Sequence, residues 1–287
     1  MMVVKKLIED RLSVDIISMS PLSGGDINDV YMLDTSAGQF IIKSNYREMF
    51  PNMLEREAKG LKQLGKSGVT TPEVIDHFEH DELQVLILQY FEEERANKEF
   101  WMYFAQDLSN LHQSSHTFFG LDYDNYIGSL QQANEFKSSW EQFFIENRIK
   151  PLIKKAFDNK LLSESHLNSF EGFFTVFSEL IPVEPPSLLH GDLWSGNLLC
   201  SAGQKPVFID PAVYFGHREA DLAMTQMFGG FDSAFLNFYN DCFPLEKGWQ
   251  NRISIHNLYP NLVHLILFGR SYLSGIENVI KRFTRKN

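Results

Sequence analysis

Residues 190–210 read HGDLWSGNLLCSAGQKPVFID, and this stretch decides how the rest of the chain is interpreted. Residues 197–200 predict a short strand, residues 201–204 have the composition of a turn, and residues 206–209 predict the returning strand. A hairpin of this kind brings Asp210 back beside Asn197, because the two positions flank the paired strands. We therefore expect a carboxylate oxygen and an amide oxygen to face one point at the open end of the hairpin.

A second carboxylate, that of Asp192, precedes Asn197 by five positions. This Asp-x-x-x-x-Asn interval is that of a kinase catalytic loop, in which the Asp meets the substrate hydroxyl and the Asn holds a metal ion. The oxygens of Asn197 and Asp210 suit a Mg²⁺ ion that keeps several waters and takes its other ligands from phosphates. A surface loop would also be rich in Asp, Asn and Gly, but it would not require these residues in hairpin register.

The pattern continues beyond the hairpin. HGDLWSGN, a strand that ends in Ile-Asp-Pro, and GHREADLAMTQMFGGF at residues 216–231 together resemble the fructosamine (ketosamine) kinase family. Trp194 stands where the related antibiotic kinases usually carry His. The segments FG at 119–120 and DNYIGS at 124–129 resemble further signatures of the family, so the likeness runs through nearly the whole chain.

The resemblance implies an α+β class and a bilobal protein-kinase-like fold of the aminoglycoside-phosphotransferase type. Residues 1–91 would form a small antiparallel-sheet N-lobe that binds the nucleotide, residues 92–98 a hinge, and residues 99–287 a larger, mostly helical C-lobe with the catalytic loop and substrate site. The implied cofactors are ATP and Mg²⁺. The implied reaction is phosphorylation of the 3-hydroxyl of a ketosamine, a sugar adduct on a free amine or a protein lysine, which would favour loss of the sugar and so deglycation.

The bulk composition is that of a globular enzyme. The chain has 287 residues, 44% of them hydrophobic and 22% charged, which is enough for one large domain or two modest lobes. Its formal net charge of −11 argues against nucleic acid or an anionic membrane as the main partner and is compatible with amine-bearing substrates. We expect a monomer.

The two cysteines and the N-terminal sequence point to a reducing compartment. Cys200 and Cys242 are too few for a disulfide framework or a zinc site. The start MMVVKKLIEDRL carries five charges and no long apolar core, so it predicts neither a signal peptide nor a membrane span. A cytoplasmic location is the expectation.

The first ninety residues predict a small sheet with two helices. Apolar residues at helical spacing predict a helix over residues 2–12, and strands are expected at residues 14–19, 30–33, 40–43, 74–78 and 84–90. Pro51 is expected to open a second helix that runs through residue 64. Its expected buried stripe consists of Met53, Leu54, Ala58, Leu61 and Leu64.

Two features of this region predict phosphate binding. The turn at residues 23–28 contains two glycines, whose backbone N–H groups can approach phosphate oxygens closely, although a plain hairpin turn would use the same residues. Lys43 ends the apolar run Phe-Ile-Ile-Lys, much like the Val-Ala-Ile-Lys of kinases, although a lysine at a strand end often only reaches solvent. The resemblance pairs Lys43 with Glu57 of the second helix, with Glu55 as the competing candidate on another face.

By resemblance, each remaining candidate has a defined role. Asp192 would orient the substrate hydroxyl and accept its proton, and Trp194 would line the sugar pocket. Asp221 would anchor the backbone of the catalytic loop, which His190 opens and supports. The residues expected to contact the nucleotide are Ser23, Gly24, Gly25, Asp26, Ile27, Asn28 and Lys43, together with Gln89 and Phe91 at the hinge.

The C-terminal two thirds of the chain predict mostly helices. Long helices are expected over residues 140–157 and 161–180, and more apolar-striped helices follow residue 218. Arg148, within the first of these, is expected to form a structural ion pair.

Three other functions compete with the interpretation. The nearest is a kinase of the same fold that acts on an aminoglycoside, a choline-like amine or a thio-sugar. A second is a nucleotide-binding scaffold without turnover, which the complete set of candidate residues disfavours. A third is a hydrolase that uses His190 and Asp192, but no serine or cysteine nucleophile motif accompanies them.

Overall fold

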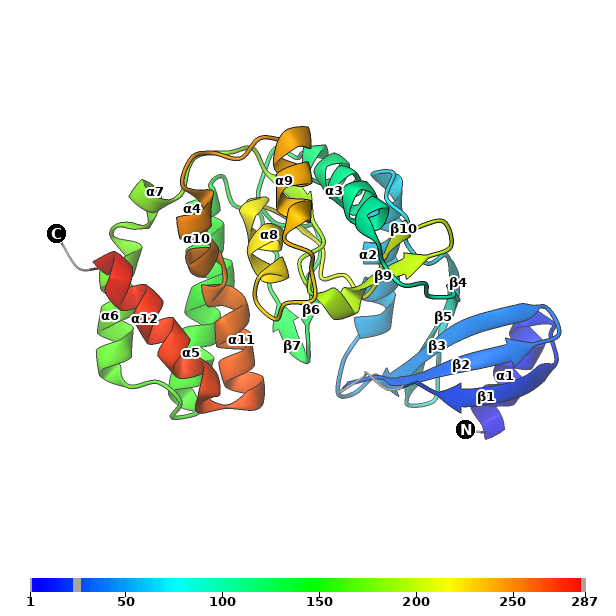
Figure 1. The fold of residues 1–287 in the computed structure, drawn as a ribbon. Coiled ribbons are helices and arrows are strands. Elements are labelled where there is room, and N and C mark those ends of the chain that lie inside the picture. Colours follow the sequence, from blue (N-terminus) through cyan, green and yellow to red (C-terminus); the bar gives the residue numbers. More distant parts are fainter. Residues whose placement is uncertain (1, 23–26, 285–287) are drawn as a thin grey trace.

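The structure is a computed structural model that describes residues 2–22 and 27–284. Two lobes are joined by residues 90–97, which form neither helix nor strand (Figure 1). The elements of the N-terminal lobe are α1 (Met2–Leu12), β1 (Ile16–Pro21), β2 (Asp29–Thr35), β3 (Gly38–Tyr46), α2 (Met53–Lys66), β4 (Val74–His80) and β5 (Leu83–Gln89). The strands form one antiparallel sheet in the order β1-β2-β3-β5-β4.

The alternating side chains of β5 explain why a helix covers each face of this sheet. Val85 and Ile87 point to one face and join the cluster that contains Ile8 of α1. Leu86 and Leu88 point to the other face and pack on the apolar stripe of α2. The predicted antiparallel sheet and the predicted buried stripe of the second helix are therefore confirmed.

The C-terminal lobe is mainly helical. Its first half contains α3 (Lys98–Gln113), β6 (Asn125–Ile127), β7 (Leu130–Gln132), α4 (Trp140–Phe143), the π-helical turn η1 (Phe144–Ile149), α5 (Lys150–Asp158), α6 (Glu164–Phe174), α7 (Phe177–Leu180) and β8 (Ser187–Leu189). Its second half contains η2 (Ser195–Asn197), β9 (Leu198–Ser201), β10 (Lys205–Phe208), β11 (Tyr214–Gly216), α8 (Glu219–Thr225), α9 (Ala234–Cys242), α10 (Trp249–His256), α11 (Leu258–Phe268), η3 (Arg270–Tyr272) and α12 (Leu273–Thr284).

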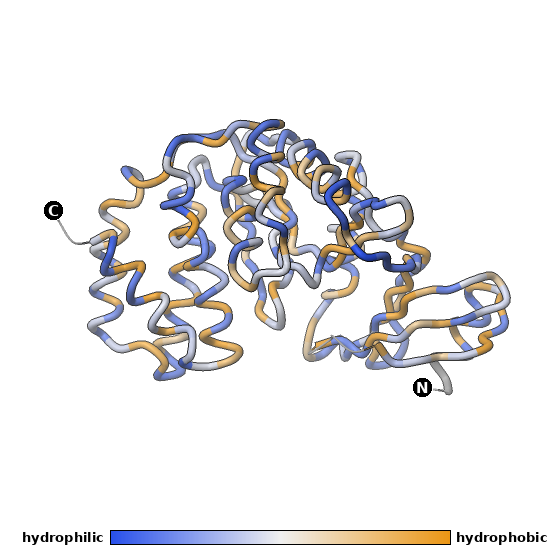
Figure 2. Tube along the Cα trace, viewed as in Figure 1, coloured by the Kyte–Doolittle hydropathy of each residue, from blue (hydrophilic) through white to orange (hydrophobic). Residues whose placement is uncertain are grey.

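The lobes lie side by side, with the small hairpins β9–β10 and β6–β7 between the sheet and the C-terminal helices (Figure 1). Hydrophobic and hydrophilic residues are interspersed along the strands and along the C-terminal-lobe helices α5, α6, α11 and α12, as expected for elements that each bury one face (Figure 2). One large apolar cluster runs from α3 to α12 and fills the C-terminal lobe.

Several expected boundaries are wrong. β3 continues to Tyr46, so Lys43 lies inside the strand and not at its end. α2 begins at Met53, after Asn52 has adopted the left-handed conformation with a φ of 59°. The helix expected over residues 161–180 is two helices, α6 and α7, with a break after Phe174.

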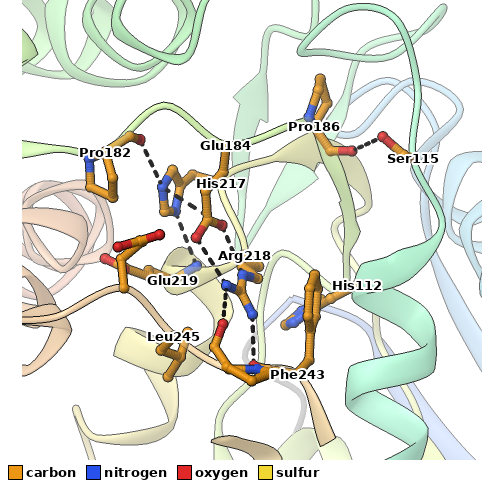
Figure 3. A network of polar contacts seen from close by, with 12 residues as sticks. His112, Ser115, Pro182, Glu184, Pro186, His217, Arg218, Glu219, Phe243 and Leu245 are labelled. Atoms are coloured by element: carbon orange, nitrogen blue, oxygen red, sulfur yellow. Dashed lines mark hydrogen bonds and ion pairs between the residues drawn. The ribbon is translucent and has the colours of Figure 1, made fainter.

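A buried ionic network fixes the junction of β11 and α8 (Figure 3). Arg218 donates to both carboxylate oxygens of Glu184, at 2.7 and 2.9 Å, and its guanidinium also donates to the Phe243 carbonyl. The Glu219 carboxylate accepts from the Nε and Nη2 of Arg252. Each buried acid thus has a guanidinium partner, which is the condition under which a buried carboxylate is tolerated.

Two histidines complete this network. His256 Nε2 lies 3.3 Å from Glu219 Oε2, and His217 Nε2 lies 3.3 Å from the Pro182 carbonyl oxygen. His217, Glu219 and His256 are close enough together to suggest a metal site, but the Arg252 guanidinium already occupies the carboxylate and supplies its counter-charge. Burial, together with the neighbouring His256, lowers the pKa of His217 to about 4, so this ring is neutral in the native protein near pH 7.

The burial of His217 makes stability depend on pH. Its folded-state pKa of about 4 lies below the ordinary value of 6.5, so its contribution is full above pH 6.5 and is lost as the pH falls from 6.5 towards 4. We expect this one group to remove up to about 3 kcal/mol of the free energy of unfolding. Urea unfolding of the wild type and of His217→Asn at pH 7.5, 6.0 and 4.5 measures it. A variant whose stability falls as steeply as that of the wild type would contradict the assignment.

Candidate active site

The loop after β8 is held by Asp221, near the start of α8. The backbone N–H groups of His190 and Gly191 donate to its carboxylate at 2.7 and 2.9 Å, and His112 Nε2 lies 3.2 Å from it. Asp221 is only 1% exposed, so these donors replace the water that the carboxylate has lost. The structure thus places Asp221 where it anchors the loop backbone.

The same loop is tied to the segment that follows the hairpin. His190 Nε2 lies 2.8 Å from the Ile209 carbonyl oxygen, and the Ala212 N–H donates to the His190 carbonyl at 2.9 Å. Gly191 has a φ of 82°, and a Cβ atom there would lie 2.1 Å from the Ala212 carbonyl oxygen, so only glycine fits. Burial lowers the pKa of His190, so its ring serves as a neutral support for the loop.

The predicted hairpin is confirmed. Strands β9 and β10 pair from Leu198 opposite Phe208 to Ser201 opposite Lys205, and the Ile209 N–H donates to the Asn197 carbonyl at 3.1 Å. The side-chain amide of Asn197 donates to the backbone carbonyl of Asp192 at 2.8 Å and to its Oδ2 at 3.0 Å. Because the amide nitrogen faces Asp192, the amide oxygen of Asn197 is directed away from it and is left for another ligand.

Lys43 joins the two lobes through carboxylates. Its ammonium donates to Glu57 Oε1 at 2.8 Å and also to Asp210 Oδ1. Burial alone would lower the pKa of Lys43, but the charges of Asp210 and Glu57 outweigh it and raise this pKa, so the lysine stays charged. Glu55, the competing partner, pairs instead with Lys59 at 2.7 Å on the outer face of α2.

The carboxyl group of Asp192 has a strongly raised pKa. Burial and then the nearby charge of Asp210 raise the pKa of its carboxyl group to about 7, although the hydrogen bond from Asn197 acts in the opposite direction. A carboxylate with a pKa near the working pH is an effective general base. Its Oδ2 is held by Asn197, so Oδ1 is the oxygen left for a substrate hydroxyl.

These groups share one cleft of about 670 Å³ between the lobes. Its charged and amide lining consists of Asn28, Lys43, Arg56, Glu57, Asn125, Asp192, Asn197 and Asp210. Asn28 is held there through its side-chain oxygen, which accepts from Asn45 at 2.6 Å, and Ile27 also contributes to the lining. The rest of the predicted phosphate turn, Ser23 to Asp26, lies outside the described residues.

Aromatic side chains also line the cleft. Trp194 is one of them, with Phe228 at a ring-centroid distance of 6.3 Å and His264 5.0 Å beyond Phe228, and its contact with a sugar stays a prediction. A Cβ atom on Gly196 would lie 2.2 Å from the Trp194 ring, so the glycine lets this ring fold over the loop. Sequence reasoning missed His264, although a single imidazole in the apolar run LYPNLVHLILF could have signalled it. Burial lowers the pKa of His264.

The two predicted hinge residues, Gln89 and Phe91, do not line the cleft. Gln89 ends β5 and donates its backbone N–H to the Glu73 carbonyl at 3.0 Å, so a nucleotide could meet only its carbonyl group. Neither Gln89 nor Phe91 is among the described residues that line the cleft, and their contacts with adenine stay a prediction. The connection between the lobes is tied to the catalytic hairpin, because the Glu94 N–H donates to the Cys200 carbonyl at 2.7 Å.

Comparison with known proteins agrees with this geometry. The family model described as fructosamine kinase matches residues 1–286. A probable ketoamine kinase of Enterococcus faecium is 38% identical over 92% of this chain and 94% of its own length. The chloroplastic protein-ribulosamine 3-kinase of Arabidopsis thaliana is 32% identical over 97% of this chain and 86% of its own length.

Solved structures give the same result for the fold. A putative fructosamine-3-kinase from Thermobifida fusca superposes with a TM-score of 0.89 at 30% identity, over 99% of both chains. An aminoglycoside phosphotransferase in a ternary complex with ADP and hygromycin B superposes with a TM-score of 0.67 at 12% identity over 99% of both chains, which supports the fold alone. The expected α+β, protein-kinase-like fold is confirmed. Across residues 2–22 and 27–284, no helix is both long and apolar enough to cross a membrane.

The two glutamates of α2 provide a matched test of the Lys43 ion pair. Glu57→Gln removes the charge that faces Lys43, and we expect the dissociation constant of a non-hydrolysable ATP analogue to rise about tenfold, the value of one charge-assisted hydrogen bond. Glu55→Gln removes a carboxylate of the same helix whose ion-pair partner among the described residues is Lys59, and it should leave binding unchanged. Calorimetric titration measures both, and equal effects of the two substitutions would contradict the assignment.

Proposed function

This chain belongs to the fructosamine kinase family, and we propose that it transfers the γ-phosphoryl group of ATP to the 3-hydroxyl of ketosamines. A kinase is supported at the level of the family and of the fold. The ketosamine substrate is supported by the names of the relatives, which include ketoamine kinases and a ribulosamine 3-kinase. Ketosamines on free amines or on protein lysines would lose their sugar more readily after this reaction, so we propose deglycation as its outcome.

The observation that carries the proposal is the meeting of four groups in one cleft. The carboxylate of Asp192, the amide of Asn197, the carboxylate of Asp210 and the ammonium of Lys43 all line it. Phosphoryl transfer demands positioning and charge neutralisation more than covalent chemistry from the protein, and these are the groups it uses. We assign Asp192 to orient the acceptor hydroxyl through Oδ1 and to accept its proton.

The residues present fit a divalent cation. Asn197 and Asp210 offer an amide and a carboxylate oxygen from the two strands at the open end of one hairpin, and hard oxygen donors of this kind suit Mg²⁺. Mg²⁺ bound there would neutralise charge on the phosphates of ATP. Lys43 would neutralise charge on the α- and β-phosphates, and Glu57 would hold the ammonium in position.

The acceptor end supports a sugar on a single amine rather than a polycation. Among the described residues, the carboxylates that line the cleft are those of Glu57, Asp192 and Asp210; Glu57 and Asp210 face Lys43, and Asp192 is the assigned base. The acceptor end offers the rings of Trp194 and Phe228, which can pack on a sugar and on an aliphatic or singly charged amine. An aminoglycoside with several ammonium groups would find no further carboxylate there.

We also propose that the enzyme works in the cytoplasm. Both cysteines are free in the structure, Cys200 buried and Cys242 exposed, as is usual for proteins of reducing compartments.

A substrate panel tests the proposal. We expect ATP-dependent ADP release with ribulosamines, erythrulosamines or fructosamines in the presence of Mg²⁺, and none with an aminoglycoside or choline. Turnover of choline or an aminoglycoside alone would contradict the proposed substrate.

The variant Asp192→Asn tests the assigned base. It should retain nucleotide binding and lose at least about 10²-fold in kcat, because a positioned general base contributes that much. Full turnover by this variant would contradict the assignment of Asp192.

The pKa of Asp192 predicts a pH profile. Because the carboxyl group must be ionised to accept a proton, kcat/KM should fall as the pH drops through the raised pKa of Asp192, which is about 7 in the ligand-free cleft. Mg²⁺ beside Asp210 would offset the charge that contributes to this shift and so move the inflection below 7, whereas burial keeps it above the ordinary value of 3.8. The measurement is kcat/KM for a ketosamine between pH 4.5 and 8.5 at saturating ATP and Mg²⁺. A profile that stays flat through this whole range would refute the assignment of Asp192 as the base.

A further inference from the structure

Arg148 is a buried cation without a carboxylate partner. Its side chain is fully buried, and in the described part of the chain no acid forms a salt bridge with it, so the expected ion pair is wrong. Instead its guanidinium lies over the rings of Phe143 and Tyr214, at 4.4 and 4.1 Å from their centroids. It sits in the π-helical turn η1, a rare local geometry that occurs frequently at functional sites.

The donor-only chemistry of this guanidinium orients a chain of amides. An arginine can only donate hydrogen bonds, so the side-chain oxygen of Asn134 must face it, and this oxygen accepts from Nη2 at 2.7 Å. The Asn134 amide nitrogen is thereby turned to Asn125 Oδ1, at 2.9 Å. Asn125 is oriented in turn, and its nitrogen donates to the Val213 carbonyl at 2.9 Å.

A second branch reaches the neighbouring carbonyl. Gln132 donates through Nε2 to Asn125 Oδ1 at 2.7 Å and to the Ala212 carbonyl at 3.0 Å. Its own oxygen accepts from the Tyr259 hydroxyl at 2.7 Å. The hydrogen bonds that begin at Arg148 Nη2 and at the Tyr259 hydroxyl thus lead to two consecutive backbone carbonyls, while Asn134 also donates to the Tyr123 carbonyl at 3.1 Å.

These carbonyls belong to the segment that carries Asp210. Asp210 has a φ of 54°, a conformation that a non-glycine residue adopts only when its surroundings enforce it. Pro211, whose ring fixes its own φ, is the single residue between Asp210 and the clamped carbonyl of Ala212. Holding Ala212 and Val213 thus limits where the Asp210 carboxylate can lie relative to Asn197.

We propose that Arg148, Asn134, Asn125 and Gln132 form a positioning network for Asp210 and so set the affinity of the divalent-cation site. The inference rests on the proposed function for the identity of that site. Residues that orient a metal ligand from behind typically change metal affinity 10- to 100-fold when replaced.

The substitution Asn134→Asp separates positioning from folding. The new carboxylate still accepts from Arg148 and gives this cation a counter-charge, but it can no longer donate to Asn125 or to the Tyr123 carbonyl. We expect the dissociation constant of Mn²⁺, titrated by electron paramagnetic resonance with a non-hydrolysable ATP analogue and no acceptor, to rise at least about tenfold. The counter-charge for Arg148 offsets the two lost hydrogen bonds, and the melting temperature of the variant is recorded so that affinities are compared only where the variant is folded.

Ser109→Ala is the matched control. It removes one buried side-chain hydrogen bond, from Ser109 Oγ to the Gln106 carbonyl in α3, and alters no residue of the network, so Mn²⁺ affinity should stay within about twofold of wild type. If Asn134→Asp does not fold, Gln132→Met removes the donor to Ala212 without adding charge and should weaken Mn²⁺ binding to the same degree. Wild-type Mn²⁺ affinity in a folded variant of either network residue, or equal loss in Ser109→Ala, would overturn the network.

The Mn²⁺ measurement tests the network independently of the proposed ketosamine substrate. A wild-type protein that binds Mn²⁺ with the nucleotide but phosphorylates no ketosamine would refute the proposed function and leave the network standing. A wild-type protein with normal ketosamine turnover and unaltered Mn²⁺ binding in the variants would refute the network alone.

Discussion

The contact of Lys43 with carboxylates from both lobes is the interaction on which the rest of the site depends. One ammonium from β3 lies between Glu57 of α2 and Asp210 after β10, and it is almost fully buried. Two negative charges beside one positive charge leave an excess of negative charge. The pKa of Glu57 reflects this excess, because burial raises this pKa, the charge of Lys43 lowers it, and the charge of Asp210 raises it. A divalent cation beside Asp210 would relieve that excess of negative charge, so the charge pattern of the cleft favours metal and nucleotide together.

The position of α2 is fixed by the other lobe. The Tyr126 hydroxyl donates to the Pro51 carbonyl at 3.0 Å, just before the helix begins. At Gly60 the helix backbone comes so close to the C-terminal lobe that a Cβ atom would lie 3.3 Å from Pro211 and 3.4 Å from Val213. The segment clamped from behind by Arg148 is therefore also the surface on which α2 rests. In protein kinases the corresponding helix can swing and carry its glutamate out of place, whereas here the same clamped segment supports both Glu57 and Asp210.

The fold and the centre of the site follow from the sequence where short-range rules decide. The hairpin from Asn197 to Asp210 could be predicted because turn residues between two apolar runs leave one register. The pairing of Lys43 with Glu57 needed the family resemblance, since Glu55 of the same helix is an equally ordinary partner. The predicted end of β3 at Lys43 was wrong because tertiary contacts extend the strand. Asn45 is a poor strand former, but its side chain is buried and donates a hydrogen bond to Asn28.

What the sequence could not supply are contacts between distant segments. Arg148 looked like half of an ion pair, but its partners are aromatic rings and amides that only the folded chain assembles. His264 carries no motif, and its place beside Phe228 depends on how α11 packs. Asp210 could be placed next to Asn197, yet its direct contact with Lys43 depends on the relative position of the lobes.

The central claim is that Asn197 and Asp210 form the cation site that Lys43 and Asp192 flank. Crystals grown with Mn²⁺ and a non-hydrolysable ATP analogue test it most directly, through the anomalous scattering of the metal. The account predicts a peak at bonding distance from the amide oxygen of Asn197, a carboxylate oxygen of Asp210 and the phosphates. A fully bound nucleotide whose metal peak lies away from both side chains would contradict it.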